Sequence, residues 1–153
     1  MMNTLNKILS NKYLLLGLRL VLGGVFIYAA VYKIAEPEDF ARSIYNYRML
    51  PEETINLMAI IMPWLELICG IFIIIGSFVR GSAVLIGLML LVFIIAISSA
   101  LARGLDISCG CFKVGEGGRL VGLTTLVEDI LMVAAVAVIL AFGGPSFSRK
   151  RGS

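Results

Sequence analysis

Two cysteines separated by one glycine are the sharpest chemical feature of the sequence. They lie in Ser108-Cys109-Gly110-Cys111-Phe112. In an extended chain their Cα atoms can be up to about 7 Å apart, whereas a disulfide favours about 5.5 Å. Gly110 has no Cβ and can adopt positive φ, which lowers the cost of the bend that closes the bond. Because a disulfide in so small a ring is strained and easier to reduce, the pair predicts thiol–disulfide exchange.

Positive side chains flank the cysteine pair. Lys113 follows Cys111 by two residues, and Arg103 and Arg119 border the same segment. A nearby positive charge favours the thiolate, the reactive form of cysteine, although Asp106 opposes this effect. We therefore expect Lys113, Arg103 and Arg119 to stabilise a thiolate.

Two other interpretations of the cysteine pair stay open. The pair could clasp a loop in a non-catalytic assembly subunit of a membrane redox complex, or its thiolates could bind or transport a soft metal ion. The sequence has seven methionines as further soft donors, but they show no ligand spacing and are typical of helix packing. Cys69 lies inside an apolar segment, where a packing role is expected. No metal site is predicted.

Charged residues also occur inside apolar segments. Glu66 lies midway along one of them, and Glu128 and Asp129 lie at a similar depth in another. A bare carboxylate in hydrocarbon costs several kcal/mol, so such a group must be paired, protonated or hydrated. Lys33 is the most plausible positive partner. The group is predicted to be linked to protons or to a quinone head group, and a purely structural ion-pair network is the alternative. Pro63 further predicts a pocket just outward of Trp64.

The composition predicts the elements that must position these groups. Of the 153 residues 59% are hydrophobic and only 15% are charged, which excludes an ordinary soluble domain. Four apolar runs, at residues 13–35, 55–77, 81–102 and 120–142, are long enough to cross a bilayer as helices. We predict an all-α, four-helix membrane bundle forming a single domain over residues 1–153.

The sequence has no histidine, which excludes imidazole-ligated haem and His-based acid–base catalysis. With a net charge of +3 and scattered basic residues, nucleic-acid binding has no support.

The connections predict orientation and one further helix. Lys7 and Lys12 precede the first span, acidic residues follow it, and the chain ends with a basic cluster at 149–151. This pattern favours cytoplasmic N and C termini, with the cysteine segment on the outer face.

Between the first two spans, Pro37 and the spacing of Phe40, Ile44 and Tyr47 predict an amphipathic surface helix that roofs the bundle, with Tyr45 and Tyr47 at headgroup level. Five glycines permit close helix approach, namely Gly17, Gly23, Gly24, Gly70 and Gly76.

Several of these motifs together resemble the MauE/DoxX family of redox-associated membrane proteins. The resemblance covers roughly residues 13–142 and rests on the lysine that ends the first helix, Pro63-Trp64-Leu65-Glu66, and Cys109-Gly110-Cys111-Phe112 after the third helix. It implies a four-helix bundle linked to methylamine utilisation, acting with a thioredoxin-like partner, and in some members an electron path to quinone. By resemblance, Cys109 and Cys111 match the family dithiol, Glu66 its membrane carboxylate and Lys33 its first-helix lysine.

One departure concerns the fourth helix. Many relatives are expected to carry an Arg-Asp pair where this chain has Glu128-Asp129, so any salt bridge made by that arginine must be supplied differently. The expectation is a bacterial inner-membrane protein that exchanges disulfides with a periplasmic thioredoxin-like protein. Electrons would pass to or from the membrane quinone pool near Lys33, Glu66 and Asp129.

Overall fold

The computed structural model describes residues 7–105, 107 and 122–143, and these residues form helices and their connections, with no strand among them. The helices are α2 (Lys12–Ala35), α3 (Pro37–Asn46), α4 (Glu52–Ile75), α5 (Val79–Ala102) and α6 (Leu123–Phe142). Four of them, α2, α4, α5 and α6, are long and apolar enough to cross a membrane. The prediction of an all-α, four-span membrane protein is confirmed.

The helix ends differ from the predicted spans by a few residues. The second spanning helix starts at Glu52 rather than 55, because Pro51 caps it and two glutamates occupy its first turn, where the helix dipole favours negative charge. It ends at Ile75 rather than 77, since Gly76 adopts a left-handed φ of 87°. The third spanning helix begins at Val79 instead of 81, and the fourth begins at Leu123 instead of 120.

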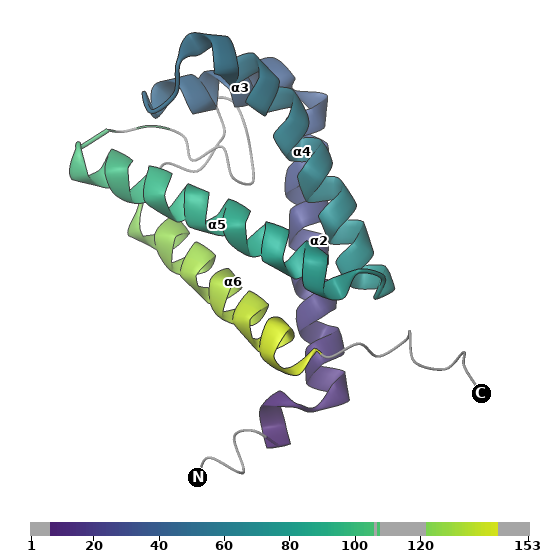
Figure 1. Cartoon of the computed structure of the whole chain (residues 1–153). Helices are drawn as coiled ribbons and strands as arrows, with labels where there is room; N and C mark the ends of the chain where they lie inside the picture. The colour runs from purple at the N-terminus through teal and green to yellow at the C-terminus, as the bar shows by residue number, and fades with distance from the viewer. Residues whose placement is uncertain (1–6, 106, 108–121, 144–153) are drawn as a thin grey trace.

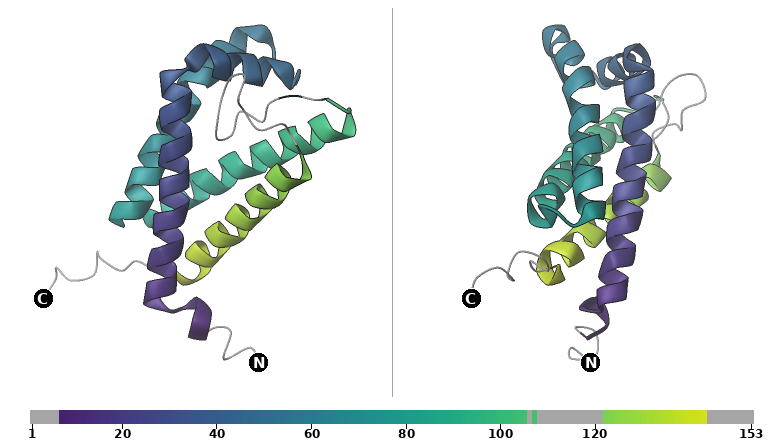
Figure 2. Two further views of the ribbon diagram at one scale, coloured as in Figure 1. Left: turned by 180° about the vertical axis from the view of Figure 1, so that it is seen from behind. Right: turned by 90° about the vertical axis from the view of Figure 1, so that its right-hand side faces the viewer.

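The four spanning helices are arranged as two pairs (Figures 1 and 2). Helices α2 and α4 run side by side, and α5 and α6 form a second pair inclined to the first. The pairs approach each other where α2 begins and α6 ends, and they diverge toward the end covered by α3. At the closed end, one apolar cluster joins all four helices: Leu22, Phe26, Cys69, Ile73, Ala83, Ile86, Leu90, Val136 and Ile139. Cys69 is buried there as a free thiol, which agrees with its predicted packing role.

Two glycines set the contact between α2 and α4. A Cβ added to Gly23 would lie 2.8 Å from the carbonyl oxygen of Gly70, and one added to Gly70 would lie 3.0 Å from the carbonyl oxygen of Gly23. Such distances leave no room for a side chain between the two backbones. Near the same end, Arg19 Nε donates a hydrogen bond of 2.9 Å to the carbonyl of Ile73. The two helices are therefore joined by close backbone packing and by a side-chain bond to the last turn of α4.

The predicted surface helix is present as α3, with proline in its first turn and Phe40 buried against Ala59 of α4. Tyr45 is half exposed, as expected for a headgroup-level side chain. Tyr47 differs from the prediction: it is 7% exposed and packs with Ile97 and Ala100 of α5. Helix α3 therefore roofs the end of the bundle by packing on α4, and Tyr47, directly after α3, packs on α5.

Candidate functional site

A buried ion pair joins the first two spanning helices. Lys33 Nζ of α2 donates to both carboxylate oxygens of Glu66 on α4, at 2.7 and 2.9 Å, and both side chains are 1% exposed. The bidentate contact satisfies both oxygens of the carboxylate in an apolar setting, where an unpaired charge is costly. The sequence predicted Lys33 as the positive partner of the three membrane carboxyls, and the structure pairs it with Glu66.

Two aromatic rings complete the surroundings of the ammonium group. Lys33 Nζ lies 5.0 Å from the ring centroid of Phe40 on α3 and 5.0 Å from that of Phe93 on α5. Ring faces attract a cation at this distance, and the attraction is larger when the cation is shielded from water. The charge of Lys33 is therefore stabilised by side chains from α3, α4 and α5.

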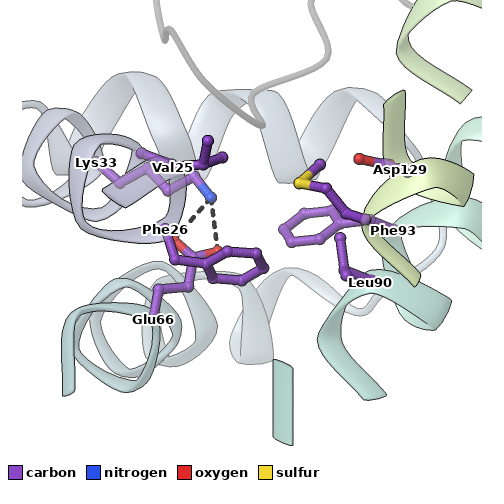
Figure 3. Close-up of a pocket in the computed structure, with 9 residues that line it drawn as sticks. Val25, Phe26, Lys33, Glu66, Leu90, Phe93 and Asp129 are labelled. Carbon is purple, nitrogen blue, oxygen red and sulfur yellow. Dashed lines mark hydrogen bonds and ion pairs between the residues drawn. The ribbon is translucent and has the colours of Figure 1, made fainter. Parts of the chain in front are cut away.

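A second carboxyl faces the pair across a small cavity (Figure 3). Asp129 of α6 is 2% exposed, and its Oδ2 has no hydrogen-bond partner among the residues that the structure describes. The cavity offers about 20 Å³ to the centres of water molecules, and its other walls are apolar: Val25, Phe26, Ala29, Leu90, Phe93 and Met132. Since one water needs about 10–15 Å³ by this measure, the space suits a single water between charged groups.

Some predicted site residues lie elsewhere. Glu128 is half-buried and is not among the residues that line the cavity, because neighbouring residues on a helix point in directions about 100° apart. Trp64 is 51% exposed and does not line this cavity, which α4 reaches with Glu66. The pocket expected just outward of Trp64 stays a prediction. Of the two acidic residues of α6 that lie near the depth of Glu66, Asp129 lines the cavity and Glu128 does not.

Arg103 has a structural role at the end of α5. Its guanidinium donates to the carbonyl of Ser99 in its own helix and to that of Tyr47 at the end of α3. Both acceptors are uncharged, so the positive charge of Arg103 remains at this end of the bundle. The other predicted residues of the dithiol site, Cys109, Cys111, Lys113 and Arg119, lie outside the described residues.

The described flanks of the cysteine segment share one apolar cluster. Leu105 and Ile107 after α5, and Leu126 in the first turn of α6, pack around buried Tyr47, Ile97 and Ala100. Asp129 follows Leu126 by three residues, which is about one helical turn, or roughly 5 Å. The cluster that anchors both ends of the cysteine segment therefore lies next to the charged cavity.

The sequence did not predict that Phe93 lines the cavity or that Tyr47 lies near Asp129. Burial, and then the charge of Asp129, raise the pKa of the Tyr47 phenol, so this side chain stays neutral at physiological pH. The helical spacing of Tyr47 with Phe40 and Ile44 is a signal that it lies on the inward face of the surface helix, and the structure has it buried rather than at headgroup level. Phe93 gave no signal, because one phenylalanine within a continuous apolar run does not differ from its neighbours in pattern.

Four spanning helices with an ion pair and a further carboxyl in their interior define a multi-pass membrane protein with an intramembrane polar site. Exposed apolar side chains along the spans place the chain in contact with the lipid bilayer. The sequence profile described as "Methylamine utilisation protein MauE" matches residues 11–142. The chain belongs to the MauE family.

Individual relatives agree with this assignment. The chain is 31% identical over 130 residues to "Methylamine utilization protein MauE" of Paracoccus denitrificans, covering 84% of this chain and 69% of that protein. It is 35% identical over 93 residues to the protein of the same name from Methylorubrum extorquens, covering 60% of this chain and 50% of that protein. The alignment with the relative from Methylophilus methylotrophus covers 45% of that protein. The chain thus spans about half to two thirds of these relatives, and no solved structure matches it.

Proposed function

We propose that the protein is a thiol–disulfide exchange protein of the bacterial inner membrane, an accessory protein of the methylamine-utilisation type. Cys109 and Cys111 would cycle between dithiol and disulfide on the periplasmic face and exchange with a thioredoxin-like partner. Membership of the family supports the accessory role. The Cys-Gly-Cys spacing supports the chemistry, since the ring it closes is small and readily reduced.

One structural observation carries the proposal furthest. Both described flanks of the cysteine segment are held by the apolar cluster around Tyr47, at the end of the bundle that α3 covers. This anchoring supports a dithiol kept at the membrane surface, where a partner outside the bilayer can reach it. Arg103 lies at the same end, and with Lys113 and Arg119 it is proposed to favour the thiolate.

The exchange between the cysteine pair and the partner's disulfide needs no further oxidant or reductant. A thiolate of the pair attacks the partner's disulfide and forms a mixed disulfide, with one partner sulfur leaving as a thiolate. The second cysteine then attacks the mixed disulfide, which leaves Cys109 and Cys111 joined and the partner reduced. Two electrons and two protons pass from the pair to the partner, and the reverse direction uses the same steps.

The quinone pool remains a proposed electron carrier for the membrane half of the cycle. However, the space between Lys33, Glu66 and Asp129 accommodates about one water, and Lys33 already donates to both oxygens of Glu66. A quinone ring does not fit between these groups as they lie. No electron-transfer step is assigned to a quinone at this cavity.

Single cysteine variants test the exchange. If the pair is redox-active, Cys109→Ser or Cys111→Ser leaves one thiol that cannot resolve the mixed disulfide, so one of the variants should accumulate a covalent complex with a thioredoxin-like protein. The complex should disappear on reduction. Cys69→Ser is the matched control, since Cys69 is buried in the bundle and should leave the exchange intact.

The same variants separate the two alternatives. A loop clasp in an assembly subunit predicts that Cys109→Ser/Cys111→Ser lowers membrane levels or has no effect, whereas exchange predicts lost function at normal levels. A soft-metal site predicts a thiophilic ion that co-purifies with the wild type and is absent from the double variant. Failure to trap any covalent complex in either single variant would contradict the proposed exchange.

A further inference from the structure

Among the residues that the structure describes, Asp129 is a buried acid that takes part in no ion pair. The ammonium of Lys33, which lines the same cavity, is bonded to both oxygens of Glu66 at 2.7 and 2.9 Å. It also lies between two aromatic rings. Within the described part of the chain, Asp129 Oδ2 is buried without a hydrogen bond. If Asp129 were ionised, the cavity would hold two carboxylates and one ammonium, with a net charge of −1.

The described neighbours of Asp129 supply no positive charge other than that of Lys33. Among the described residues, the titratable groups near it are Lys33 from α2, Tyr47 at the end of α3, Glu66 from α4 and Glu128 on its own helix. From α5, Leu90 and Phe93 line the cavity, and both are apolar. A buried carboxylate without a dedicated cation or hydrogen bonds costs several kcal/mol, and a carboxyl group usually avoids this by binding a proton.

We propose that Asp129 carries a proton and, with Lys33, Glu66 and one water in the cavity, forms an intramembrane proton-binding site. The sequence predicts a proton-linked role for these residues, and the proposal assigns the proton to Asp129, whereas Lys33 and Glu66 stay charged and paired. It goes beyond the proposed function and does not depend on thiol exchange.

A water in the cavity would connect Asp129 to the Lys33–Glu66 pair through hydrogen bonds. A buried water typically makes two to four hydrogen bonds. The cavity presents the carboxyl of Asp129 on one side and the Lys33–Glu66 pair on the other, as Figure 3 shows, with room for about one water. A water there can accept a hydrogen bond from protonated Asp129 and donate one toward the carboxylate of Glu66. The other walls of the cavity are apolar and offer no further acceptor for the proton.

Infrared spectroscopy tests the proposal directly, because the carbonyl band of a protonated carboxylic acid is separate from carboxylate bands. The purified full-length protein is measured in lipid at neutral pH, and again in the Cys109→Ser/Cys111→Ser background so that the result is independent of the thiols. We expect a protonated-acid band that shifts in D₂O and is lost in Asp129→Asn. Glu128→Gln, a change at the adjacent residue of α6, should retain it.

Other outcomes overturn the proposal. If Asp129→Asn removes a carboxylate band instead, Asp129 is ionised, and if Glu128→Gln removes the acid band, the proton belongs to Glu128. Should Asp129→Asn fail to fold, Asp129→Glu keeps the acid and must move the band to a new position. A band unchanged in Asp129→Glu would contradict the assignment. Because the test gives the same readout without cysteines, its failure leaves thiol exchange untouched, and the reverse also holds.

Discussion

At the scale of single residues, Lys33 and Glu66 depend on each other. Each is 1% exposed, and each supplies the charge that makes the other tolerable in the bundle. Removing one partner of a buried pair leaves an uncompensated charge, which costs about 3–5 kcal/mol, whereas replacing both with apolar side chains is often neutral. A comparison of the single and double variants of this pair therefore distinguishes a structural role of the charges from a functional one.

We predict that Lys33→Met and Glu66→Leu each lower membrane levels and thermal stability, and that Lys33→Met/Glu66→Leu restores both. Levels are measured by immunoblot of membranes and stability by thermal unfolding in detergent. If the double variant regains stability but not activity, the charges serve function as well as folding. Single variants as stable as the wild type would show that the pair does not form in the membrane.

Tyr47 gives a prediction about alkaline pH. Burial raises the pKa of its phenol above the unfolded value of about 10. Because the folded state then holds the proton more tightly than the unfolded state, this contribution is complete below about pH 10 and is lost as the pH rises further. We expect the wild type to lose stability above about pH 10 more steeply than Tyr47→Phe. Parallel curves for the two proteins in thermal unfolding would contradict a buried, neutral Tyr47.

At the scale of elements, the contact of α2 with α4 depends on Gly23. A methyl group there would lie 2.8 Å from the carbonyl oxygen of Gly70 and 2.5 Å from Ile74 Cγ1. Separating the backbones to make room is a form of overpacking that typically costs about 1–3 kcal/mol. The same separation would pull Glu66 away from Lys33, since the two residues lie on these helices.

We predict that Gly23→Ala destabilises the protein by this amount, measured by thermal or denaturant unfolding in detergent. Gly24→Ala is the control: the next residue of the same helix is exposed, and an added Cβ would have no atom within 4 Å. It should be neutral or slightly stabilising because alanine favours a helix. Equal effects at the two positions would show that α2 and α4 do not cross at Gly23.

The elements were predictable where a long apolar run dictates the structure. Such a run must be helical in lipid, so the four spans follow directly from composition. Their ends depend on caps instead: Pro51 and Gly76 set the ends of α4, and neither interrupts the hydrophobic pattern.

The site shows a similar limit. The ionic pairing of Lys33 with Glu66 followed from depth and charge, but the choice of Asp129 over Glu128 depends on the rotation of α6. That rotation is set by the packing of α6 against the other helices, and a single sequence does not reveal this packing. The contact of Phe93 with Lys33 depends in the same way on how α5 is inclined to α2.

At the scale of the whole molecule, four spans bring the start of α2 and the end of α6 to one face of the membrane (Figure 1). Helix α3 and the described flanks of the cysteine segment lie at the other end. The basic residues before α2 favour the cytoplasm for the first face. The dithiol would then be periplasmic, together with α3.

Introduced cysteines test this topology. In protein without its three native cysteines, Glu38→Cys on α3 and Lys12→Cys at the start of α2 place single thiols at exposed positions. We predict that a membrane-impermeant thiol reagent labels Glu38→Cys in sealed spheroplasts and labels Lys12→Cys only after lysis. The opposite pattern would invert the protein in the membrane and place the dithiol in the cytoplasm.

The redox state and side of the native pair are tested most directly by labelling Cys109 and Cys111 themselves. Sealed spheroplasts expressing Cys69→Ser protein are treated with an impermeant thiol reagent, with and without prior mild reduction, and the labels are counted by mass. We predict two labels after reduction and none before it, as expected for an exchangeable disulfide on the periplasmic face. Two labels without reductant would show a standing dithiol. Labelling that requires lysis would contradict periplasmic thiol–disulfide exchange.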